Sequence, residues 1–279
     1  MELINNEYKI IKKIEQNRKI SSYAVQDIVD NKIRKLIIIN SDYLSKTLIN
    51  FLINNFTDLS NVETEGILKV FNFGLVSSID NKRLAYKQYY YTSEYLKGYY
   101  KVNDLIEDLS HKEIIDVYVQ VCMAINYLNL RGIKYEEINL ENILLYKKDN
   151  KLKVKLMDLV TLEVESSYLK GEIKGGLIFK APEILNGENP TIESEIYSLG
   201  VLAVILFFMK NNIKVDFKTD IHSIINDSLL EFHKLYLDEK IKRIIKKMIS
   251  NNPKDRYHNI NEIFYDMNKV LGTNYAPYN

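Results

Sequence analysis

The segment KYEEINLENILLY, residues 134–146, gathers residue types that could carry out chemistry. It holds three glutamates and two asparagines, one of which is Asn142, and it runs into a short apolar stretch that predicts a strand. Acidic side chains that cluster ahead of a buried strand are typical of active sites. No cation follows Lys134 within the segment. The question is whether this loop transfers a group or keeps only the shape of a loop that does.

Composition and charge narrow the classes of protein to which the chain can belong. With 279 residues, of which 46% are hydrophobic, it can bury a large core as one long domain or as two lobes. The 38 basic and 37 acidic residues leave a net charge of +1, which argues against nucleic-acid binding as the main function. The single cysteine, Cys122, rules out a disulfide framework, and no signal-peptide pattern opens the sequence. We expect a cytoplasmic protein that does not bind a membrane.

The first third of the chain reads mainly as strands. Residues 8–15 and 22–29 alternate between polar and apolar side chains on either side of a polar turn, which predicts a β-hairpin. Residues 33–39, IRKLIII, are rich in β-branched side chains and predict a buried strand. Residues 45–56 have helical spacing, and two further strands are expected around the turn at 79–83. Five strands and one helix predict a small β-rich lobe.

The hydrophobic period becomes helical from about residue 100. Residues 111–132 predict a long amphipathic helix that ends at Gly132, and two short strands follow at 142–146 and 153–158. The stretch IESEIYSLGVLAVILFFMK, residues 192–210, is apolar nearly all round, and its longest apolar run is too short to cross a bilayer. It is therefore expected to be a central, buried helix.

Five motifs, in their order along the chain, resemble those of the eukaryotic-type Ser/Thr protein kinases that also occur in bacteria. They are RGIKYEEINLENILL, similar to the catalytic loop H-R-D-L-K-P-E-N; KLMDLV, similar to the D-F-G strand end; APE at 181–183; SEIYSLGVL in the central helix; and NPKDRYHNINEIFYDM in the closing helices. Five motifs in order are far more specific than any one of them. The resemblance covers residues 8–272.

The resemblance implies an α+β, bilobal protein-kinase fold, with ATP and Mg²⁺ as the cofactors of the active members. Residues 1–96 are expected to form a small lobe of five strands and one helix, and residues 97–272 a larger, mainly helical lobe. Residues 273–279 are expected to be a tail or the start of a linker. The chain also resembles the kinase-like modules at the N-terminus of large bacterial signalling proteins, so further domains or a protein partner are expected.

The segment that should cover the phosphates, EQNRKI at residues 15–20, contains no glycine. Protein kinases hold the phosphates under a glycine-rich turn whose backbone amides approach closely. Side chains at Glu15, Asn17 and Ile20 would obstruct such a cradle. Arg18 and Lys19 in the same segment could reach a phosphate. Alternatively, both are solvated at the tip of the turn.

The strand that should carry the phosphate-binding lysine lacks it at the expected position. Alignment with the V-A-I-K pattern puts Ile38 at the lysine and Leu36 at the residue that contacts adenine. Lys35 has the opposite parity and points to the other face, unless the alignment shifts by one residue; both registers stay open. The glutamate that pairs with this lysine falls at Asn54 or Asn55. Loss of both charges is coherent, because a lone, partly buried charge is costly.

The catalytic-loop motif has lost its cations. Tyr135, Glu136 and Glu137 replace H-R-D, and Asn139 replaces the lysine that follows. Glu137, at the position of the catalytic base, could accept a hydroxyl proton, but it is one methylene longer than aspartate, and a misplacement of about 1 Å can cost roughly a hundredfold in rate. Glu136 reverses the charge of the arginine that pairs with a phosphorylated activation segment, so that switch is not expected here.

Asn142 and Asp158 match the two oxygen ligands that hold Mg²⁺ in active kinases. Alternatively, Asn142 pins the loop by hydrogen bonds and Asp158 caps a turn. The D-F-G motif becomes Asp158-Leu159-Val160, in which Leu159 can fill the apolar slot of the phenylalanine. Val160 cannot easily adopt the conformations open to glycine, so a mobile switch is not expected.

The resemblance also assigns an adenine site and a set of structural residues. The adenine site is expected to consist of Leu36, Ile38, Ser93, Glu94, Leu96 and Leu144. Backbone groups of the hinge SEYL, residues 93–96, would pair with the ring and the leucines would sandwich it; alternatively, Ile38 and Ile20 fill this space. Glu183 and Arg256 resemble a buried structural ion pair, and Glu195 at the start of the central helix is also expected to be structural.

The missing cations and the retained architecture together favour a pseudokinase, a catalytically impaired regulatory or docking module that binds adenine nucleotide weakly. The alternative is an active, atypical Ser/Thr kinase that uses Glu137 as base, Asn142 and Asp158 for Mg²⁺, and Lys35 or Arg18 on phosphate. A small-molecule phosphotransferase fits less well, because such enzymes normally lack the APE motif and the closing helices.

Overall fold

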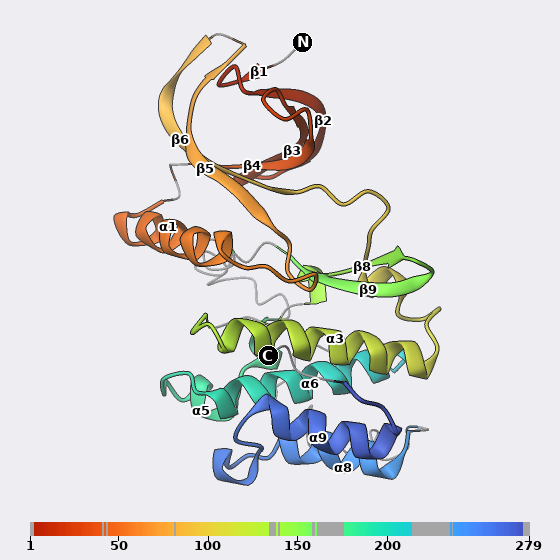
Figure 1. Ribbon diagram of the computed structural model, residues 1–279. Coiled ribbons are helices and arrows are strands. Elements are labelled where there is room, and N and C mark those ends of the chain that lie inside the picture. Colours follow the sequence, from red (N-terminus) through yellow and green to blue (C-terminus); the bar gives the residue numbers. More distant parts are fainter. Residues whose placement is uncertain are drawn as a thin grey trace. The chain divides into compact units, whose positions relative to one another are not determined.

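The computed structural model describes residues 3–40, 42, 44–80, 82–133, 138, 140–157, 160, 176–213, 235 and 237–275. The chain divides into two compact units, which are described separately. The first is built on residues 3–98, and the second on residues 99–157 and the described residues from 176 onward. Figure 1 traces the elements of each unit.

The first unit contains a closed barrel of antiparallel strands (Figure 1). Its strands are β1 Leu3–Ile4, β2 Tyr8–Gln16, β3 Ile20–Asp27, β4 Ile33–Ile39, β5 Val70–Ile79 and β6 Lys82–Glu94, hydrogen-bonded in the order β1-β2-β3-β4-β6-β5. β1 pairs with both β2 and β5 and thereby closes the barrel. The sequence predicted five strands. The sixth, β1, has two residues and is too short to show an alternating pattern.

Apolar side chains from all six strands fill the interior of this barrel. The cluster consists of Ile4, Tyr8, Val25, Leu36, Ile38, Val76 and Tyr90, each at most 6% exposed. Because successive side chains of a strand point to opposite faces, the neighbours of these residues point away from the interior. β4 therefore has Leu36 and Ile38 inside, while Lys35 and Ile37 lie on the outer face of the barrel.

Helix α1, Lys46–Ser60, packs against β5. The hydroxyl oxygen of Ser45 caps it by accepting a hydrogen bond from the N–H of Leu48 at 3.2 Å. Leu52 and Leu59, at helical spacing, are its buried residues. The helix predicted for residues 45–56 is confirmed and extends one turn further.

The second unit is mainly helical, with a three-stranded sheet (Figure 1). Its elements are β7 Tyr100–Lys101, α2 Val102–Leu105, α3 His111–Asn129, the 3-10 turn η2 Leu140–Asn142, β8 Ile143–Lys148, β9 Lys151–Leu156, η3 Gly176–Phe179, α5 Pro182–Leu185, α6 Ile192–Lys210, α8 Glu239–Met248, η4 Pro253–Asp255 and α9 Ile260–Leu271. A capping box begins α3: Ser110 Oγ accepts from the N–H of Glu113, whose carboxylate accepts from the N–H of Ser110. The chain leaves the helix through Gly132, at φ +73°.

Helix α6 lies in the core of the second unit. It is long and apolar enough to cross a membrane by composition, but 67% of that apolar window is buried inside the protein, which is typical of a core helix. α8 packs closely against it at Gly200. A Cβ atom at Gly200 would lie 2.6 Å from Ile249 Cγ2 and 2.8 Å from Met248 Cβ, so this approach requires glycine.

Ser22 and Ser194 allow the cost of a buried, unpaired hydroxyl group to be measured. Ser22 Oγ in β3 is buried and has no hydrogen-bond partner in the described part of the chain, whereas Ser194 Oγ donates to Thr191 O at 2.7 Å and accepts from Thr191 N at 2.9 Å. We expect Ser22→Ala to raise the thermal unfolding midpoint, since an unsatisfied buried polar group costs about 1–3 kcal/mol. Ser194→Ala should lower it, because it removes the hydrogen bonds of the Ser194 side chain in the capping box, each worth about 0.5–1.5 kcal/mol. Circular dichroism monitors the unfolding of both variants. A lower midpoint for Ser22→Ala would contradict the assignment of Ser22 Oγ as a buried, unpaired hydroxyl group.

Candidate functional site

Part of the catalytic-loop motif lies outside the described residues. The structure describes Ile138 and residues 140–146 of this segment. Lys134, Tyr135, Glu136, Glu137 and Asn139 lie outside the described residues, as do Asp158 and Leu159. The roles of Glu137 as a base and of Asp158 as a metal ligand therefore stay predictions.

Asn142 lies at the junction between the loop and the sheet of the second unit. It ends η2, is 8% exposed, and directly precedes β8. Its backbone oxygen accepts a hydrogen bond from the N–H of Met157 at 2.9 Å, which ties the start of β8 to the end of β9. The hairpin therefore fixes the backbone from which the Asn142 side chain projects.

The described residues do not by themselves form a Mg²⁺ site. Mg²⁺ in proteins takes oxygen ligands in octahedral geometry, usually one or two carboxylates together with water and phosphate oxygens. Among the residues that the structure describes, no group of three or more His, Cys, Asp or Glu side chains could hold a metal ion. Asn142 supplies a single amide oxygen, so no catalytic step through a metal follows from these residues.

The carboxylate of Glu141 has partners that the sequence did not reveal. Lys101 Nζ lies 2.5 Å from its Oε2, and Asn103 Nδ2 donates to its Oε1 at 2.8 Å. The side chains of Lys101 and Glu141 are 45% and 52% exposed, so this ion pair contributes at most about 1 kcal/mol to stability. The sequence shows an acidic residue next to Asn142, but it does not show that Lys101 is its partner, because the two residues lie 40 positions apart.

The turn between β2 and β3 uses its own backbone donors. Asn17 Oδ1 accepts hydrogen bonds from the N–H of Lys19 at 2.8 Å and from the N–H of Ile20 at 2.9 Å. Asn17 N–H donates to Ile20 O at 2.9 Å, and Asn40 N–H donates to Lys19 O at 2.7 Å. A phosphate cradle requires backbone N–H groups that point at the ligand. Asn17 therefore occupies donors that a cradle would need.

Leu36 and Ile38 lie inside the barrel, and the adenine contacts expected of them stay a prediction. Both side chains belong to the barrel-interior cluster, at 0% and 5% exposed, so they do not lie on its outer face. That face carries Lys35 and Ile37, and Lys35 lies directly opposite Ser93 of β6. The last four positions of β4 are all apolar, so alternation in the sequence could not decide which of them point inward.

The residues expected to form the hinge lie at the end of β6 and just beyond it. Ser93 is 1% exposed, and its hydroxyl oxygen has no hydrogen-bond partner among the described residues. Glu94 N–H donates to Lys69 O at 2.8 Å, so this backbone donor is engaged within the first unit. Leu96 is half-buried, and Leu144, in the second unit, is 3% exposed. Contact of these residues with adenine stays a prediction.

The lone cysteine is not a candidate nucleophile. Cys122 is buried in α3, and this burial raises the pKa of its thiol to about 12. Because the thiolate is the reactive form, the group is inert at neutral pH.

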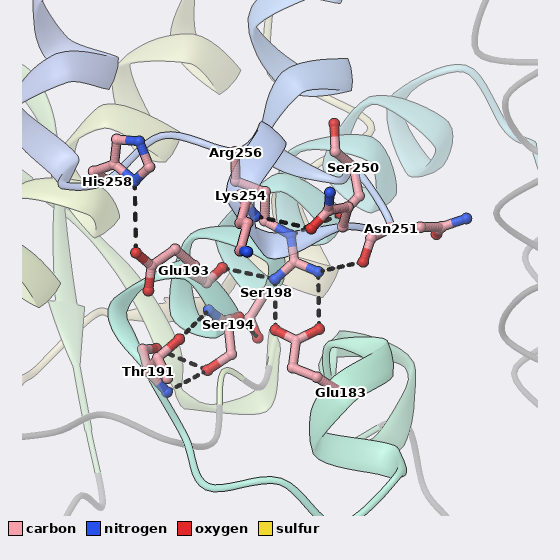
Figure 2. A network of polar contacts seen from close by, with 11 residues as sticks. Glu183, Thr191, Glu193, Ser194, Ser198, Ser250, Asn251, Lys254, Arg256 and His258 are labelled. Atoms are coloured by element: carbon pink, nitrogen blue, oxygen red, sulfur yellow. Dashed lines mark hydrogen bonds and ion pairs between the residues drawn. The ribbon is translucent and has the colours of Figure 1, made fainter.

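Arg256 and Glu183 form a buried, bidentate ion pair (Figure 2). Nη1 donates to Glu183 Oε1 at 2.6 Å and Nη2 to Oε2 at 2.9 Å. The remaining guanidinium N–H groups donate to backbone oxygens: Nε to Ser250 at 2.7 Å, Nη1 to Glu193 at 3.0 Å and Nη2 to Asn251 at 3.2 Å. All five donors of the guanidinium group are thereby used. The structure brings together the two residues that the sequence paired.

Two further residues of α6 support this region. Tyr197 lies under the guanidinium group of Arg256, 4.8 Å from ring centroid to Cζ, and burial raises the pKa of its hydroxyl group to about 12. Glu195 Oε2 accepts from Asn129 Nδ2 at 2.5 Å, which joins α6 to the last residue of α3.

Val160, from the D-L-V motif, is 1% exposed.

These elements, a β-rich unit with one capped helix and a helical unit held by a Glu–Arg pair, are those of a protein kinase. Residues 82–266 match the family model of the protein kinase domain, which is more than half of the chain. The chain belongs to the protein kinase domain family. The match begins in β6, so the turn around Asn17 and all of β4 lie before it.

Relatives of the chain include bacterial kinases. The chain is 24% identical over 213 residues to the serine/threonine-protein kinase PknG of Mycolicibacterium smegmatis, covering 76% of this chain and 26% of PknG. It is 22% identical over 218 residues to the serine/threonine-protein kinase PknD of Chlamydia felis, covering 65% of this chain and 23% of PknD. It spans 20–31% of the length of the first curated relatives that it matches.

Solved structures show the same fold. The crystal structure of the PknI kinase domain of Mycobacterium tuberculosis superposes with a TM-score of 0.67, covering 96% of both chains at 16% identity. At this level of identity the likeness concerns the fold alone.

We expect Arg256→Met to lower the free energy of unfolding by roughly 3–5 kcal/mol, because it leaves the Glu183 carboxylate buried without its partner. Arg256→Lys should also be destabilising, since lysine cannot reproduce the bidentate contact. Urea denaturation measures both. The matched control is Arg243→Met on α8, an exposed arginine whose Nε donates to Glu239 O at 3.3 Å. Equal losses for the variants at 256 and 243 would contradict the structural role.

Proposed function

We propose that this chain is a pseudokinase, a kinase-fold domain that has lost efficient phosphate transfer and acts as a regulatory or docking module in signalling. Protein kinases in general use ATP and Mg²⁺, and they lower the barrier by positioning the phosphates and neutralising their charge. A chain that keeps the fold but not those charges keeps surfaces that other proteins can recognise.

The observation that carries this proposal is the turn at Asn17. Its side chain accepts the N–H groups of Lys19 and Ile20, and it takes the place of a glycine-rich turn whose amides would face phosphate. Opening these two hydrogen bonds would cost about 0.5–1.5 kcal/mol each. The turn is thus stable in a form that offers fewer donors to a phosphate group.

A second supporting observation comes from β4. In the register of the structure, Lys35 and Ile37 lie on the outer face, at the spacing that the alanine and the lysine of the V-A-I-K pattern share. An isoleucine then stands where the phosphate-binding lysine would be. The proposal also draws on the catalytic loop, where Glu136 and Glu137 replace the arginine and aspartate of H-R-D. Both residues lie outside the described part of the chain.

The alternative is an active, atypical Ser/Thr kinase. Lys35 favours it, because this cation lies on the outer face of β4, two residues from the usual lysine position. In this alternative Glu137 acts as the base, Asn142 and Asp158 hold Mg²⁺, and Lys35 or Arg18 contacts phosphate. The relatives named above are serine/threonine-protein kinases, which also favours it.

A phosphate-transfer assay separates the two functions. We expect no incorporation of radiolabelled phosphate from ATP, into the chain itself or into a generic protein substrate, above the background of a heat-denatured sample. Incorporation that disappears in both Glu137→Gln and Asp158→Ala would establish the active kinase instead. A variant outside the expected site, Lys240→Gln, serves as the control for nonspecific loss.

Any binding of nucleotide is expected to be weak and driven by the adenine ring. The hinge at residues 93–96, in the first unit, would supply backbone groups to the adenine ring, and these do not depend on the lost phosphate contacts. Calorimetric titration should therefore give affinities for adenosine, ADP and ATP with Mg²⁺ that agree within about threefold, or about 0.6 kcal/mol. ATP that binds about tenfold more tightly than adenosine would refute the adenine-driven model. Silence for all three ligands would indicate that side chains of the protein fill the space.

A further inference from the structure

The chain turns back on itself after α9. The helix ends at Leu271, and Gly272 follows at φ +62° with its N–H donating to Asn268 O. Thr273 N–H donates to the same oxygen at 3.3 Å. A left-handed residue directly after a helix is a common cap, which satisfies carbonyl groups of the last turn. We call residues 272–275 the latch, because they are held against two helices, α9 and α3.

The side chain of Asn268 holds the backbone of the latch. Its Nδ2 donates to Tyr275 O at 2.8 Å, and its Oδ1 accepts from Tyr275 N at 2.7 Å and from Thr273 Oγ1 at 3.0 Å. One amide group thus serves as donor and as acceptor for two residues of the latch. The latch therefore has a defined conformation, in which the side chain of Tyr275 reaches α3.

The hydroxyl group of Tyr275 joins the latch to α3. It donates to Asp116 Oδ1 at 2.6 Å, across 159 positions of the sequence. Further along α3, Asn126 Nδ2 donates to Asn261 Oδ1 at 3.3 Å, so α9 runs antiparallel to α3 and its end comes to the first turns of that helix. A hydrogen bond to an ionised carboxylate is roughly twice as strong as one between neutral groups. The contact with Asp116 therefore holds the latch on α3.

The turn of α3 that receives the latch also supports the sheet of the second unit. Gln120 lies one turn after Asp116, and its side-chain amide donates to Asp116 O at 3.3 Å. The same side chain donates to Leu152 O at 3.1 Å and accepts from Val154 N at 3.1 Å. Within the described part of the chain, β9 is the last strand in the order β7-β8-β9. Gln120 thus ties the edge of β9 to the place where the latch docks.

Tyr275 differs from two other tyrosines whose hydroxyl groups face a carboxylate. Tyr257 donates to Asp266 Oδ2 at 2.8 Å and is 2% exposed, and the hydroxyl group of Tyr90 lies 3.5 Å from Glu7 Oε2 in a residue that is 6% exposed. Tyr275 is partly exposed, and the three residues before it are exposed. Short surface segments open locally at lower cost than a packed core. Of these three tyrosines, Tyr275 is the one that a modifying enzyme can reach.

We propose that Tyr275 is a phosphorylation site and that its phosphorylation opens the latch. A separate tyrosine kinase would transfer the γ-phosphoryl group of ATP. The phenolic oxygen forms a bond to the γ-phosphorus, the bond from that phosphorus to the oxygen of ADP breaks, and the phenolic proton passes to a base of the kinase. The product has no hydroxyl hydrogen to donate, and it carries a charge of about −1.5 to −2.

The phosphate group would lie next to the carboxylate of Asp116. Within the described residues, Asp116 forms no ion pair that would neutralise this carboxylate. Repulsion between two anions therefore replaces the hydrogen bond that holds the latch. The Arg256–Glu183 pair takes no part in these contacts, so the latch can open while the unit stays folded.

A change of pH does not operate the latch. Burial, followed by the hydrogen bond to Asp116 and the charge of that carboxylate, raises the pKa of the Tyr275 hydroxyl group to about 12. The group therefore keeps its hydrogen throughout the neutral range, and a covalent change is what removes the donor. The latch goes beyond the pseudokinase function, and it does not depend on whether the chain itself transfers phosphate.

The test measures amide hydrogen exchange of the latch by mass spectrometry, in the unmodified full chain and in a chain with phosphotyrosine placed at position 275 by stop-codon suppression. The matched control carries phosphotyrosine at position 265, because Tyr265 lies on α9 and is 70% exposed. Tyr275→Phe removes the hydrogen bond without adding charge. Asp116→Asn keeps an acceptor for the hydroxyl group and removes the negative charge. Circular dichroism establishes that each chain is folded.

We expect phosphotyrosine at position 275 to speed exchange of the amides of Thr273 and Tyr275 about tenfold, and Tyr275→Phe to speed it about threefold, because the latter adds no repulsion. Phosphotyrosine at position 265 should leave the rates within about twofold. In Asp116→Asn, the effect of the phosphate should fall to about that of Tyr275→Phe. Exchange no faster with phosphotyrosine at 275 than in Tyr275→Phe, an equal effect at position 265, or an undiminished effect in Asp116→Asn would each overturn the proposal.

Incubation of the full chain with a broad-specificity tyrosine kinase and ATP tests whether the hydroxyl group can be reached. We expect mass spectrometry to find phosphate on Tyr275 and none on the buried Tyr257. Absence of phosphate from Tyr275 would overturn its assignment as a modification site. A parallel sample without the added kinase separates this modification from phosphate transfer by the chain itself, so that failure of the pseudokinase assignment is not confused with failure of the latch.

Discussion

The guanidinium group of Arg256 joins three separate segments of the second unit, because each of its five N–H groups has an acceptor in α5, at the start of α6 or in the turn after α8. Arg256 as a whole residue is 1% exposed, so water cannot replace a lost partner of its guanidinium group. The helices that meet there also depend on close packing, since Gly200 lets α6 and α8 approach more closely than any side chain would permit. The Arg256–Glu183 ion pair and the close approach at Gly200 therefore both hold the helices of this unit together.

Residues that hold this fold and residues that would handle phosphate are physically separate in the chain. The Arg256–Glu183 pair, the contact of Glu195 with Asn129 and the capping box of α3 involve no group that would touch a nucleotide. The turn at Asn17 and the outer face of β4 can therefore change without unfolding the protein, and Asn17 even adds hydrogen bonds where glycine would have none. The proposed loss of transfer chemistry is compatible with retention of the fold, because different interactions would carry them.

The sequence predicted the elements well where periodicity was strong and poorly where it was weak. The long helices α3 and α6 follow from apolar spacing, and the ordered motifs led to the Glu183–Arg256 pair. The sequence left the parity of β4 open, because four consecutive apolar residues carry no alternation. Only closure of the barrel decides that Leu36 and Ile38 point inward. Similarly, no local signal shows that Asn17 accepts two backbone N–H groups or that Lys101 meets Glu141, because both depend on the folded geometry.

The contact of Gln120 with β9 has a consequence for the colloidal behaviour of the protein. An unpaired strand edge is a template for addition of a strand from another molecule, and it promotes aggregation. A single side-chain amide here reproduces the hydrogen bonds of a missing strand at Leu152 and Val154, the apolar centre of β9. Lysines flank that centre along the strand and repel an identical edge. At this edge, a residue of a neighbouring helix therefore takes the place of a strand from another molecule.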